Sequence, residues 1–331
     1  METESWNGMY VIRRIFNPEI YQGKYKHNNY FEGWYYKLID KTSQNILGVI
    51  PGVSFSERDR HAFIQFIDAN SGFTEYVKFR MEDFHYSEKV LDIKINRNYF
   101  NKFGLTVDID SANLNVCGNV DFVNIVPFPK SFFNPGIMGP YSFVPFMECH
   151  HGIVNMHCDL RGSLVYNGKN IDFTGGYGYL EKDWGSSFPE AWIWLQSNHF
   201  AGGNVSVMFS VASIPWINRS FNGFISFLKI NDRLYRFASY TGARIYRVNF
   251  KDQKLYISVG DSRHLLKLEV NNSRGGILKA PKKGMMDVEI TETITSSVKV
   301  TLYNRKGERL YSGTGNNTGL ELAGEYEKFL T

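Results

Sequence analysis

The sequence predicts an all-β protein built from antiparallel sheets with few helices. Three observations predict it. Hydrophobic residues recur at every second position in many short segments, Asn, Asp and Gly separate these segments, and aromatic residues make up 16% of the 331 residues. Alternation at two residues predicts strands with one buried face. Strands repeated about every 8–12 residues indicate barrels or sandwiches rather than alternating strands and helices.

Each expected element follows from one of these patterns. Hairpins are expected where Asn, Asp or Gly supplies a positive φ, at residues 166–170, 229–235 and 303–311. The only helix candidate is the C-terminal segment 320–330, "LELAGEYEKFL". Alternation predicts strands over residues 73–81, 91–96, 105–110, 153–162, 205–211, 224–230, 254–260 and 297–303.

A segment rich in Pro and aromatic residues interrupts the strand pattern. Residues 125–152 hold five of the ten Pro, and Pro is confined to edges and bulges of sheets. We therefore expect a linker or long loop that crosses between two β units, ordered by its Phe and Tyr. The predicted domains are residues 1–172, including this crossover, and 173–331. The similarity of 31–40 to 190–200 fits two related barrels in tandem, but chance explains it almost as well.

Composition and charge argue against several classes of protein. The net charge of +4 is spread along the chain without a basic block, so nucleic-acid binding is not expected. Three Cys without a C-x-x-C motif favour a reducing compartment over a disulfide framework. No apolar run approaches the roughly 18 residues of a membrane span, and no signal-peptide pattern is present. A cytoplasmic protein is expected.

The histidines near residue 150 do not predict a metal site. Glu148, His150 and His151 lie close together in the sequence, and His157 follows. On an unbroken strand His151 and His157 would lie about 20 Å apart, which is too far for one ion. Without a recognised metal-binding spacing, we predict no metal. The histidines are expected to be polar groups of a pocket or core residues bonded to the backbone.

Two stretches place acids beside tryptophan. In residues 30–37, Glu32, Trp34 and Tyr36 share one strand face, so Glu32 is either the buried partner of a cation or an acid in a pocket. In "GYLEKDWGSSFPEAWIW" (178–194), Glu181 and Asp183 share a face, and Lys182 points away. Trp192 and Trp194 then share a face of the next strand, which Gln196 and Asn198 continue.

The second stretch suggests acid-initiated chemistry on an apolar molecule. An acid packed against tryptophan is desolvated, which raises its pKa and lets it donate a proton near neutral pH. Tryptophan faces stabilise a developing cation. A structural turn braced by a salt bridge is the alternative. No serine-hydrolase or nucleotide-binding motif is present. A protein that acts on or binds sugars, suggested only by paired acids and Trp platforms, ranks last.

Three motifs give the chain a family resemblance. With "YFEGWYYKLI" (30–39), "GPYSFVPFMECHHGIV" (139–154) and "GGYGYLEKDWGSSFPEAWIWLQSNHF" (175–200), it resembles the tocopherol cyclase family. It is more distantly similar to the two-domain, lipocalin-like carotenoid hydratase group.

The resemblance implies two tandem lipocalin-like β-barrels or half-barrels. It also implies an intramolecular lyase or isomerase that needs no cofactor and closes a chromanol ring on a prenylated quinol. In that reaction the prenyl double bond is protonated, a tertiary cation forms, and the quinol oxygen attacks it. The alternatives are a hydratase that adds water to a prenyl double bond, and a non-catalytic carrier of an isoprenoid or another apolar lipid.

Carried over by position, the resemblance implies roles for single residues. Asp183 is the best proton donor, Glu181 the second, and Glu148 or Glu32 are alternatives. His151 and Asn198 would orient the phenol or take up its proton. The residues implied to line the path of the prenyl chain are Trp34, Tyr36, Tyr141, Trp184, Trp192 and Trp194.

Partners and location follow from the same resemblance. An apolar isoprenoid or prenylquinol ligand would be extracted from a bilayer, so we expect transient contact with a membrane surface. The first motif begins close to residue 1, so the transit extension of plant relatives, and a plastid location, are not expected.

Overall fold

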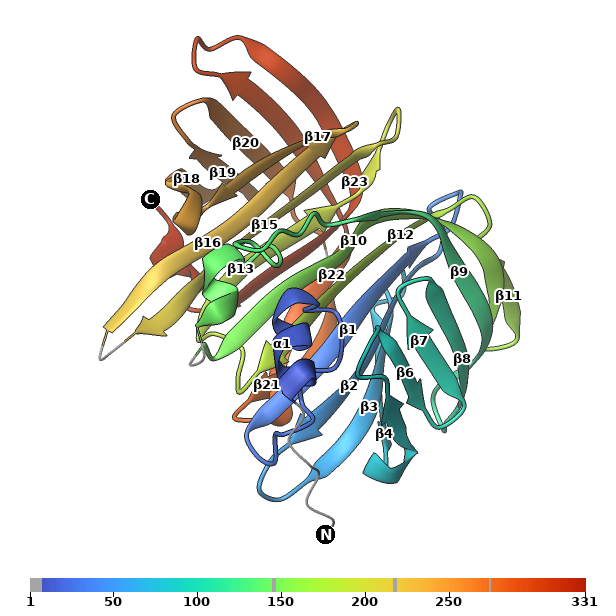
Figure 1. The fold of residues 1–331 in the computed structure, drawn as a ribbon. Coiled ribbons are helices and arrows are strands. Elements are labelled where there is room, and N and C mark those ends of the chain that lie inside the picture. The colour runs from blue at the N-terminus through green and yellow to red at the C-terminus, as the bar shows by residue number, and fades with distance from the viewer. Residues whose placement is uncertain (1–7, 145–146, 217–218, 274) are drawn as a thin grey trace.

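The computed structural model describes residues 8–144, 147–216, 219–273 and 275–331, which form two large antiparallel sheets (Figure 1). The described residues contain one α-helix, α1 (Gly8–Phe16), and four short 3-10 helices, Met81–Asp83, Gly139–Phe143, Ser239–Thr241 and Tyr326–Phe329. The all-β prediction with few helices is confirmed, and no helix in the described part of the chain is long and apolar enough to cross a membrane.

The first sheet has the strand order β4-β3-β2-β1-β12-β10-β9-β8-β7-β6-β5, and β11 pairs with β10. It curls so that aromatic side chains from distant strands meet inside it. The rings of Phe66 and Tyr166 lie 5.1 Å apart, and Tyr36 contacts both Phe100 and Phe122. Its strands are β1 (Tyr30–Ile39), β2 (Ile46–Phe55), β3 (Arg60–Asp68), β4 (Phe73–Phe79), β5 (Phe84–Tyr86), β6 (Asp92–Ile95), β7 (Asn98–Asn101), β8 (Gly104–Asp110), β9 (Asn115–Pro127), β10 (Cys149–Tyr166), β11 (Lys169–Asp172) and β12 (Tyr177–Gly185).

The second sheet has the order β17-β16-β15-β13-β23-β22-β20-β19-β18, with β14 on β23 and β21 on β22. Its strands are β13 (Ala191–Ser197), β14 (His199–Phe200), β15 (Val205–Trp216), β16 (Arg219–Ile230), β17 (Arg233–Ala238), β18 (Arg244–Lys251), β19 (Lys254–Gly260), β20 (His264–Asn271), β21 (Gly276–Lys282), β22 (Met285–Asn304) and β23 (Arg309–Gly324). The chain passes from the first sheet to the second between β12 and β13, and the domain boundary at residue 172 stays a prediction.

The two sheets pack against each other through a third buried layer. Figure 1 shows the β21–β22 hairpin of the second sheet reaching alongside the first strands of the first sheet. Gln65 on β3 accepts from the backbone N–H of Lys279 (2.8 Å) and donates to its carbonyl (3.3 Å). The layer is apolar and includes Tyr35, Ile67, Tyr179, Trp192, Trp194, Phe227 and Ile294.

The predicted hairpins are confirmed, whereas the helix prediction is wrong. The hairpins join β10 to β11, β16 to β17 and β22 to β23, and Asn167 and Asn231 adopt φ of 47° and 50° in the first two. Residues 320–324 belong to β23, followed by a 3-10 turn at Tyr326–Phe329. Pairing of β23 with β13 and β22 overrides the local helix propensity. The true helix, α1, was not predicted.

The Pro-rich segment does not cross between the sheets. It includes the end of β9 and the start of β10, which are neighbours in the first sheet, so its predicted role as a crossover between β units is wrong. Its aromatic content has another cause. Phe128 packs on Phe227 at 5.7 Å, and the Tyr240 hydroxyl donates to the Ile137 carbonyl (2.7 Å), so the loop covers part of the second sheet.

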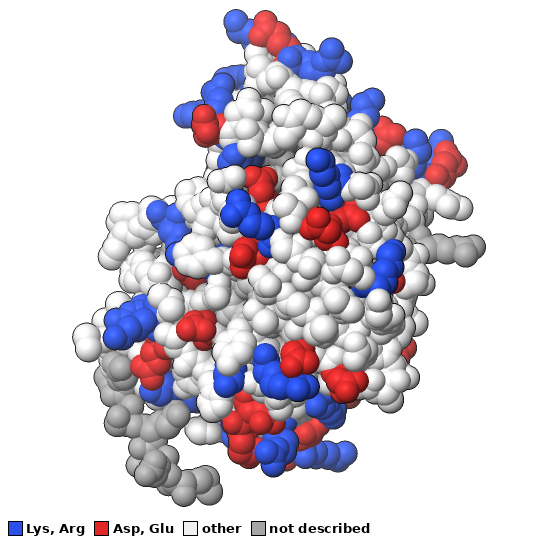
Figure 2. Space-filling view, turned by 90° about the vertical axis from the view of Figure 1, so that its right-hand side faces the viewer, with Lys and Arg blue, Asp and Glu red and all other residues white. Residues whose placement is uncertain are grey.

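Charges of both signs are interspersed over the face shown in Figure 2, and neither sign forms a continuous patch on its described residues. The expectation that the protein binds no nucleic acid stays a prediction.

Candidate active site between the two sheets

Strand β12 lies between β1 and β10 and presents different chemistry on its two faces. Successive side chains of a strand point to opposite faces. Tyr179, Glu181 and Asp183 therefore face the second sheet, while Lys182 points into the first. The predicted alternation of Glu181, Lys182 and Asp183 is confirmed by their contacts on opposite sides of the strand.

Lys182 forms a fully buried ion pair with Glu32 inside the first sheet. Its Nζ lies 2.5 Å from Glu32 Oε1 and donates to the carbonyls of Pro18 (2.8 Å) and Ile20 (2.6 Å). Burial lowers the pKa of Lys182 to about 8 and raises that of Glu32, because both charges are desolvated, although each favours the charged form of the other.

This arrangement accounts for three of the predicted site residues. Trp34 and Trp184 face the Lys182 ammonium at 4.8 and 4.6 Å, and Tyr36 belongs to the same interior cluster. Glu32, Trp34 and Tyr36 therefore lie in the interior of the first sheet and do not line the pocket between the two sheets.

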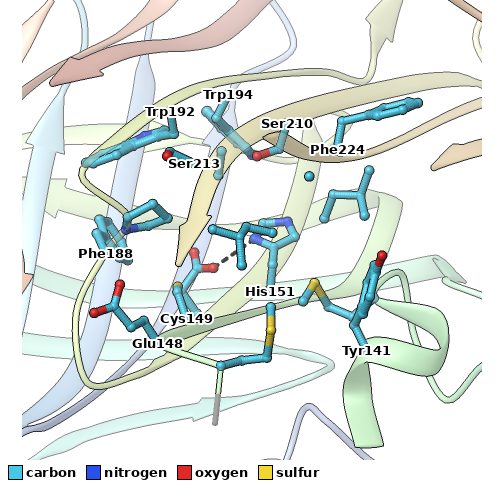
Figure 3. Close-up of a pocket in the computed structure, with 18 of the residues that line it drawn as sticks. Tyr141, Glu148, Cys149, His151, Phe188, Trp192, Trp194, Ser210, Ser213 and Phe224 are labelled. Atoms are coloured by element: carbon cyan, nitrogen blue, oxygen red, sulfur yellow. Dashed lines mark hydrogen bonds and ion pairs between the residues drawn. The ribbon is translucent and has the colours of Figure 1, made fainter. Parts of the chain in front are cut away.

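A pocket opens on the other face of β12, between the two sheets (Figure 3). The space between its walls, including the solvent at its mouth, is about 920 Å³. The walls are mostly apolar, and polar groups converge on one side. Its lining includes Tyr141, Glu148, His151, Glu181, Asp183, Phe188, Trp192, Trp194, Ser210, Phe224 and Glu321.

His151 on β10 lies between two carboxyl groups of the pocket. Its Nδ1 is 2.8 Å from Asp183 Oδ1, the contact drawn as a dashed line in Figure 3, and its Nε2 is 3.4 Å from Glu181 Oε2. The Tyr179 hydroxyl donates to Glu181 (2.6 Å). Burial lowers the pKa of His151, but the two carboxylates outweigh it and hold this pKa well above its usual range. The two carboxyl groups therefore favour the imidazolium form of His151.

The same three residues are close enough together to be candidate metal ligands. His151, Glu181 and Asp183 each offer one ligand atom, and these atoms lie within 4.8 Å of one another. However, the carboxylates face opposite ring nitrogens, Asp183 facing Nδ1 and Glu181 facing Nε2. An ion bound to one nitrogen would meet only one carboxylate unless the side chains rearranged. A protonated imidazole bonds to Asp183 through Nδ1 and attracts Glu181 across 3.4 Å, although its Nε2 has no hydrogen-bond partner among the described residues. The arrangement as it stands fits an ion-paired histidine better than a metal centre.

The sequence analysis did not predict a second pair of acidic residues near the pocket. Glu292 on β22 and Glu321 on β23 are directly opposite each other in the register. Tyr35 donates to Glu292 (2.6 Å), and the Trp192 indole N–H donates to Glu321 (2.5 Å). Glu321 lines the pocket. Glu321 was not predicted as a site residue because it lies in the segment 320–330, where a helix was expected. Its position opposite Trp194 also depends on a strand pairing that the sequence does not reveal.

The remaining predicted residues divide between the pocket and its surroundings. Tyr141, Glu148, Trp192 and Trp194 line the pocket. Burial and the nearby Glu190 raise the pKa of Glu148. Trp184 stacks on His150 outside the pocket, with ring centroids 5.2 Å apart. Asn198 donates to the Gly178 carbonyl (2.7 Å) and is also outside it.

The fold and this site define a two-sheet β protein with an acid-containing, largely apolar pocket between its sheets. Residues 122–324 match the family model described as tocopherol cyclase-like, and the chain belongs to that family. It is similar to the chloroplastic tocopherol cyclase of Zea mays, with 24% identity over 193 residues, and to a probable chloroplastic tocopherol cyclase of Oryza sativa subsp. japonica, with 24% identity over 197 residues. Each alignment covers 54% of this chain and 40% of the relative.

Two solved structures with TM-scores above 0.5 support the fold. The crystal structure of CghA superposes with a TM-score of 0.53 at 10% identity, covering 89% of each chain, and so does CghA with Sch210972. A kievitone hydratase from Nectria haematococca aligns over 93% of this chain and 94% of its own, at 9% identity and a TM-score of 0.48.

Proposed function

We propose that this protein is an enzyme that cyclises a prenylated quinol to a chromanol, or carries out a related acid-catalysed isoprenoid conversion. The observation that carries the proposal is the position of His151 between Asp183 and Glu181, in a mostly apolar pocket that Trp192 and Trp194 line. Membership of the tocopherol cyclase-like family supports it.

The proposed reaction needs one proton donor and one proton acceptor. A proton adds to the prenyl double bond, the quinol oxygen forms a C–O bond to the resulting tertiary cation, and the phenol O–H releases its proton. The product is an isomer of the substrate, so no redox cofactor is required. Trp192 and Trp194 would stabilise the cation through their ring faces. The Asp183–His151 pair, with 2.8 Å between its atoms, would serve as one of the two proton-handling groups.

Replacing Asp183 by Asn tests the proposal. We expect turnover of a phytyl-substituted dimethylbenzoquinol to fall by about 10²–10⁴-fold, the usual contribution of general acid–base catalysis. Native mass spectrometry should show the same amount of retained quinol, because the apolar walls are unchanged. Asp287→Asn, at an exposed position on β22, is the matched control. Asp183→Asn with wild-type turnover would refute the role of Asp183. A product that gains the mass of water would instead indicate hydration.

A lipid carrier is the second candidate function, because both pocket acids are already paired with His151 and could be purely structural. A carrier needs the aromatic walls but not the acids. Trp192→Ala would then weaken ligand retention, Asp183→Asn would have little effect, and the retained lipid would be chemically unchanged.

We also propose that a bilayer surface delivers the ligand. Met9, Ile12 and Phe16 follow one face of α1, and Phe16 packs on Phe132 (5.5 Å) and on Phe143 (6.2 Å). Met9, Ile12, Phe132 and Phe133 are 61–73% exposed. This apolar face, with Arg13 and Arg14 in the last turn of α1, has the composition of an interfacial anchor for anionic lipid. The 3-10 helix that carries Phe143 also carries Tyr141 of the pocket wall.

A further inference from the structure

The Glu292–Glu321 pair is placed so that two negative charges on it would repel each other. The two residues lie opposite each other on adjacent strands, and both approach the buried layer between the sheets. Like charges directly opposite on neighbouring strands repel. Where two carboxyl groups share a desolvated site, one of them keeps a proton, and the pair titrates as a unit.

The surroundings decide which member of the pair keeps the proton. Burial raises the pKa of Glu292 to about 7, while the Tyr35 hydroxyl and the Lys37 ammonium favour its charged form. Glu321 has the Trp192 N–H as its donor, and burial, Glu292, Glu181 and Asp183 together raise its pKa well above the usual range. The proton therefore belongs on Glu321, the member that lines the pocket.

A neighbouring group indicates that a ligand oxygen binds here. Trp194 on β13 lies directly opposite Glu321 in the register and lines the pocket. It is only 5% exposed, and its indole N–H has no hydrogen-bond partner among the described residues. A buried donor of this kind is costly unless something accepts its hydrogen bond. A quinol oxygen in the pocket would satisfy it.

We infer that Glu321 donates the proton to the substrate's double bond and that Asp183, paired with His151, accepts the proton of the phenol. This inference rests on the proposed function. The two carboxyl groups of the pocket have different environments: Glu321 is neutral beside Glu292, whereas Asp183 is paired with the imidazolium of His151. Such a difference in environment assigns one carboxyl group as the acid and the other as the base.

The proton and electron balance is complete within the pocket. The Glu321 O–H bond breaks as a C–H bond forms at the less substituted carbon of the double bond, which leaves the cation on the tertiary carbon. The quinol oxygen supplies an electron pair for the new C–O bond. Its O–H bond then breaks, and Asp183 takes the proton. Solvent returns one proton to Glu321 and removes one from Asp183, with no net oxidation or reduction.

Glu321→Gln tests the inference, because glutamine keeps the size of the side chain and an acceptor for Trp192 but carries no acidic proton. Infrared difference spectra at pH 8.5, where Glu292 with its pKa of about 7 is ionised, should show a protonated carboxyl band in the wild type that is lost in Glu321→Gln. Turnover of the phytyl-substituted dimethylbenzoquinol should fall by about 10²–10⁴-fold, with retention of the quinol unchanged and partial recovery in Glu321→Asp. Glu289→Gln, exposed on β22, is the control.

The two readouts separate the inference from the proposed function. An infrared band that persists in Glu321→Gln would overturn the assignment of the proton, whatever the activity. A lost band together with wild-type turnover would overturn the donor role while the proposed function stands. If the wild type leaves the quinol unchanged, the proposed function and the donor role both fail, and the infrared result still decides where the proton lies.

Discussion

Replacing Lys182 by methionine removes a buried ammonium that holds together the interior of the first sheet. The variant loses the ion pair to Glu32 and the two bonds to the carbonyls of Pro18 and Ile20, while Glu32 remains fully buried. Removing one partner of a buried pair costs about 3–5 kcal/mol of the free energy of unfolding. Urea titration followed by tryptophan fluorescence measures this loss as a lower midpoint.

The deficit should also depend on pH. In Lys182→Met the burial of Glu32, no longer opposed by an ammonium, raises its folded pKa further above the unfolded value of about 4.3. The folded state then favours protonated Glu32. The deficit is therefore smallest near pH 4 and grows as pH rises towards the folded pKa, by about 1.4 kcal/mol per pH unit. The double variant Glu32→Gln with Lys182→Met should recover most of the loss at pH 7.

Lys78→Met provides the control, because Lys78 forms an exposed pair with Asp59. Its loss should be below about 1 kcal/mol. The reasoning is refuted if Lys182→Met is no less stable than Lys78→Met, or if its deficit is the same at pH 5 and pH 8.

Two further predictions concern the membrane surface and the edge of the pocket. The double variant Phe132→Ser with Phe133→Ser should reduce co-sedimentation with phosphatidylserine vesicles several-fold. The control Phe103→Ser, on an exposed turn between β7 and β8, should not. Equal losses in both variants would exclude a specific contact of Phe132 and Phe133 with the membrane. Gly185→Ala should lower the free energy of unfolding by at least about 2 kcal/mol, since a Cβ there would lie 1.9 Å from the Glu148 carbonyl oxygen. Gly136→Ala, whose Cβ would make an ordinary 3.5 Å contact, should cost little in the same urea titration, and equal effects would contradict the steric argument.

Local patterns predicted the strands well because each depends on residues close together in the chain. The alternation over 73–81, 91–96 and 105–110 corresponds to β4, β6 and β8. Turn chemistry located the hairpins for the same reason. The helix prediction failed where pairing with distant strands decided the conformation of residues 320–324. The family resemblance is likewise confirmed by the match of residues 122–324.

The site was harder to predict because both faces of its strands are buried. In β1 nine of ten residues are buried, so alternation could not show which face meets the pocket. Trp34 and Tyr36 were therefore assigned to a ligand path but belong to the packed interior of the first sheet. Glu321 reaches the pocket only through the pairing of β23 with β13, and that register is invisible in a single sequence.

The position of the pocket has a consequence for how the two halves of the chain depend on each other. His151 and Asp183 come from the first sheet, whereas Trp192, Trp194 and Glu321 come from the second. Either half expressed alone would therefore carry only part of the wall. A molecule bound in the pocket would touch both sheets, so its binding free energy would oppose their separation as well as their unfolding. In this architecture a ligand would become part of the interface between the two sheets, and the pocket is complete only while they remain joined.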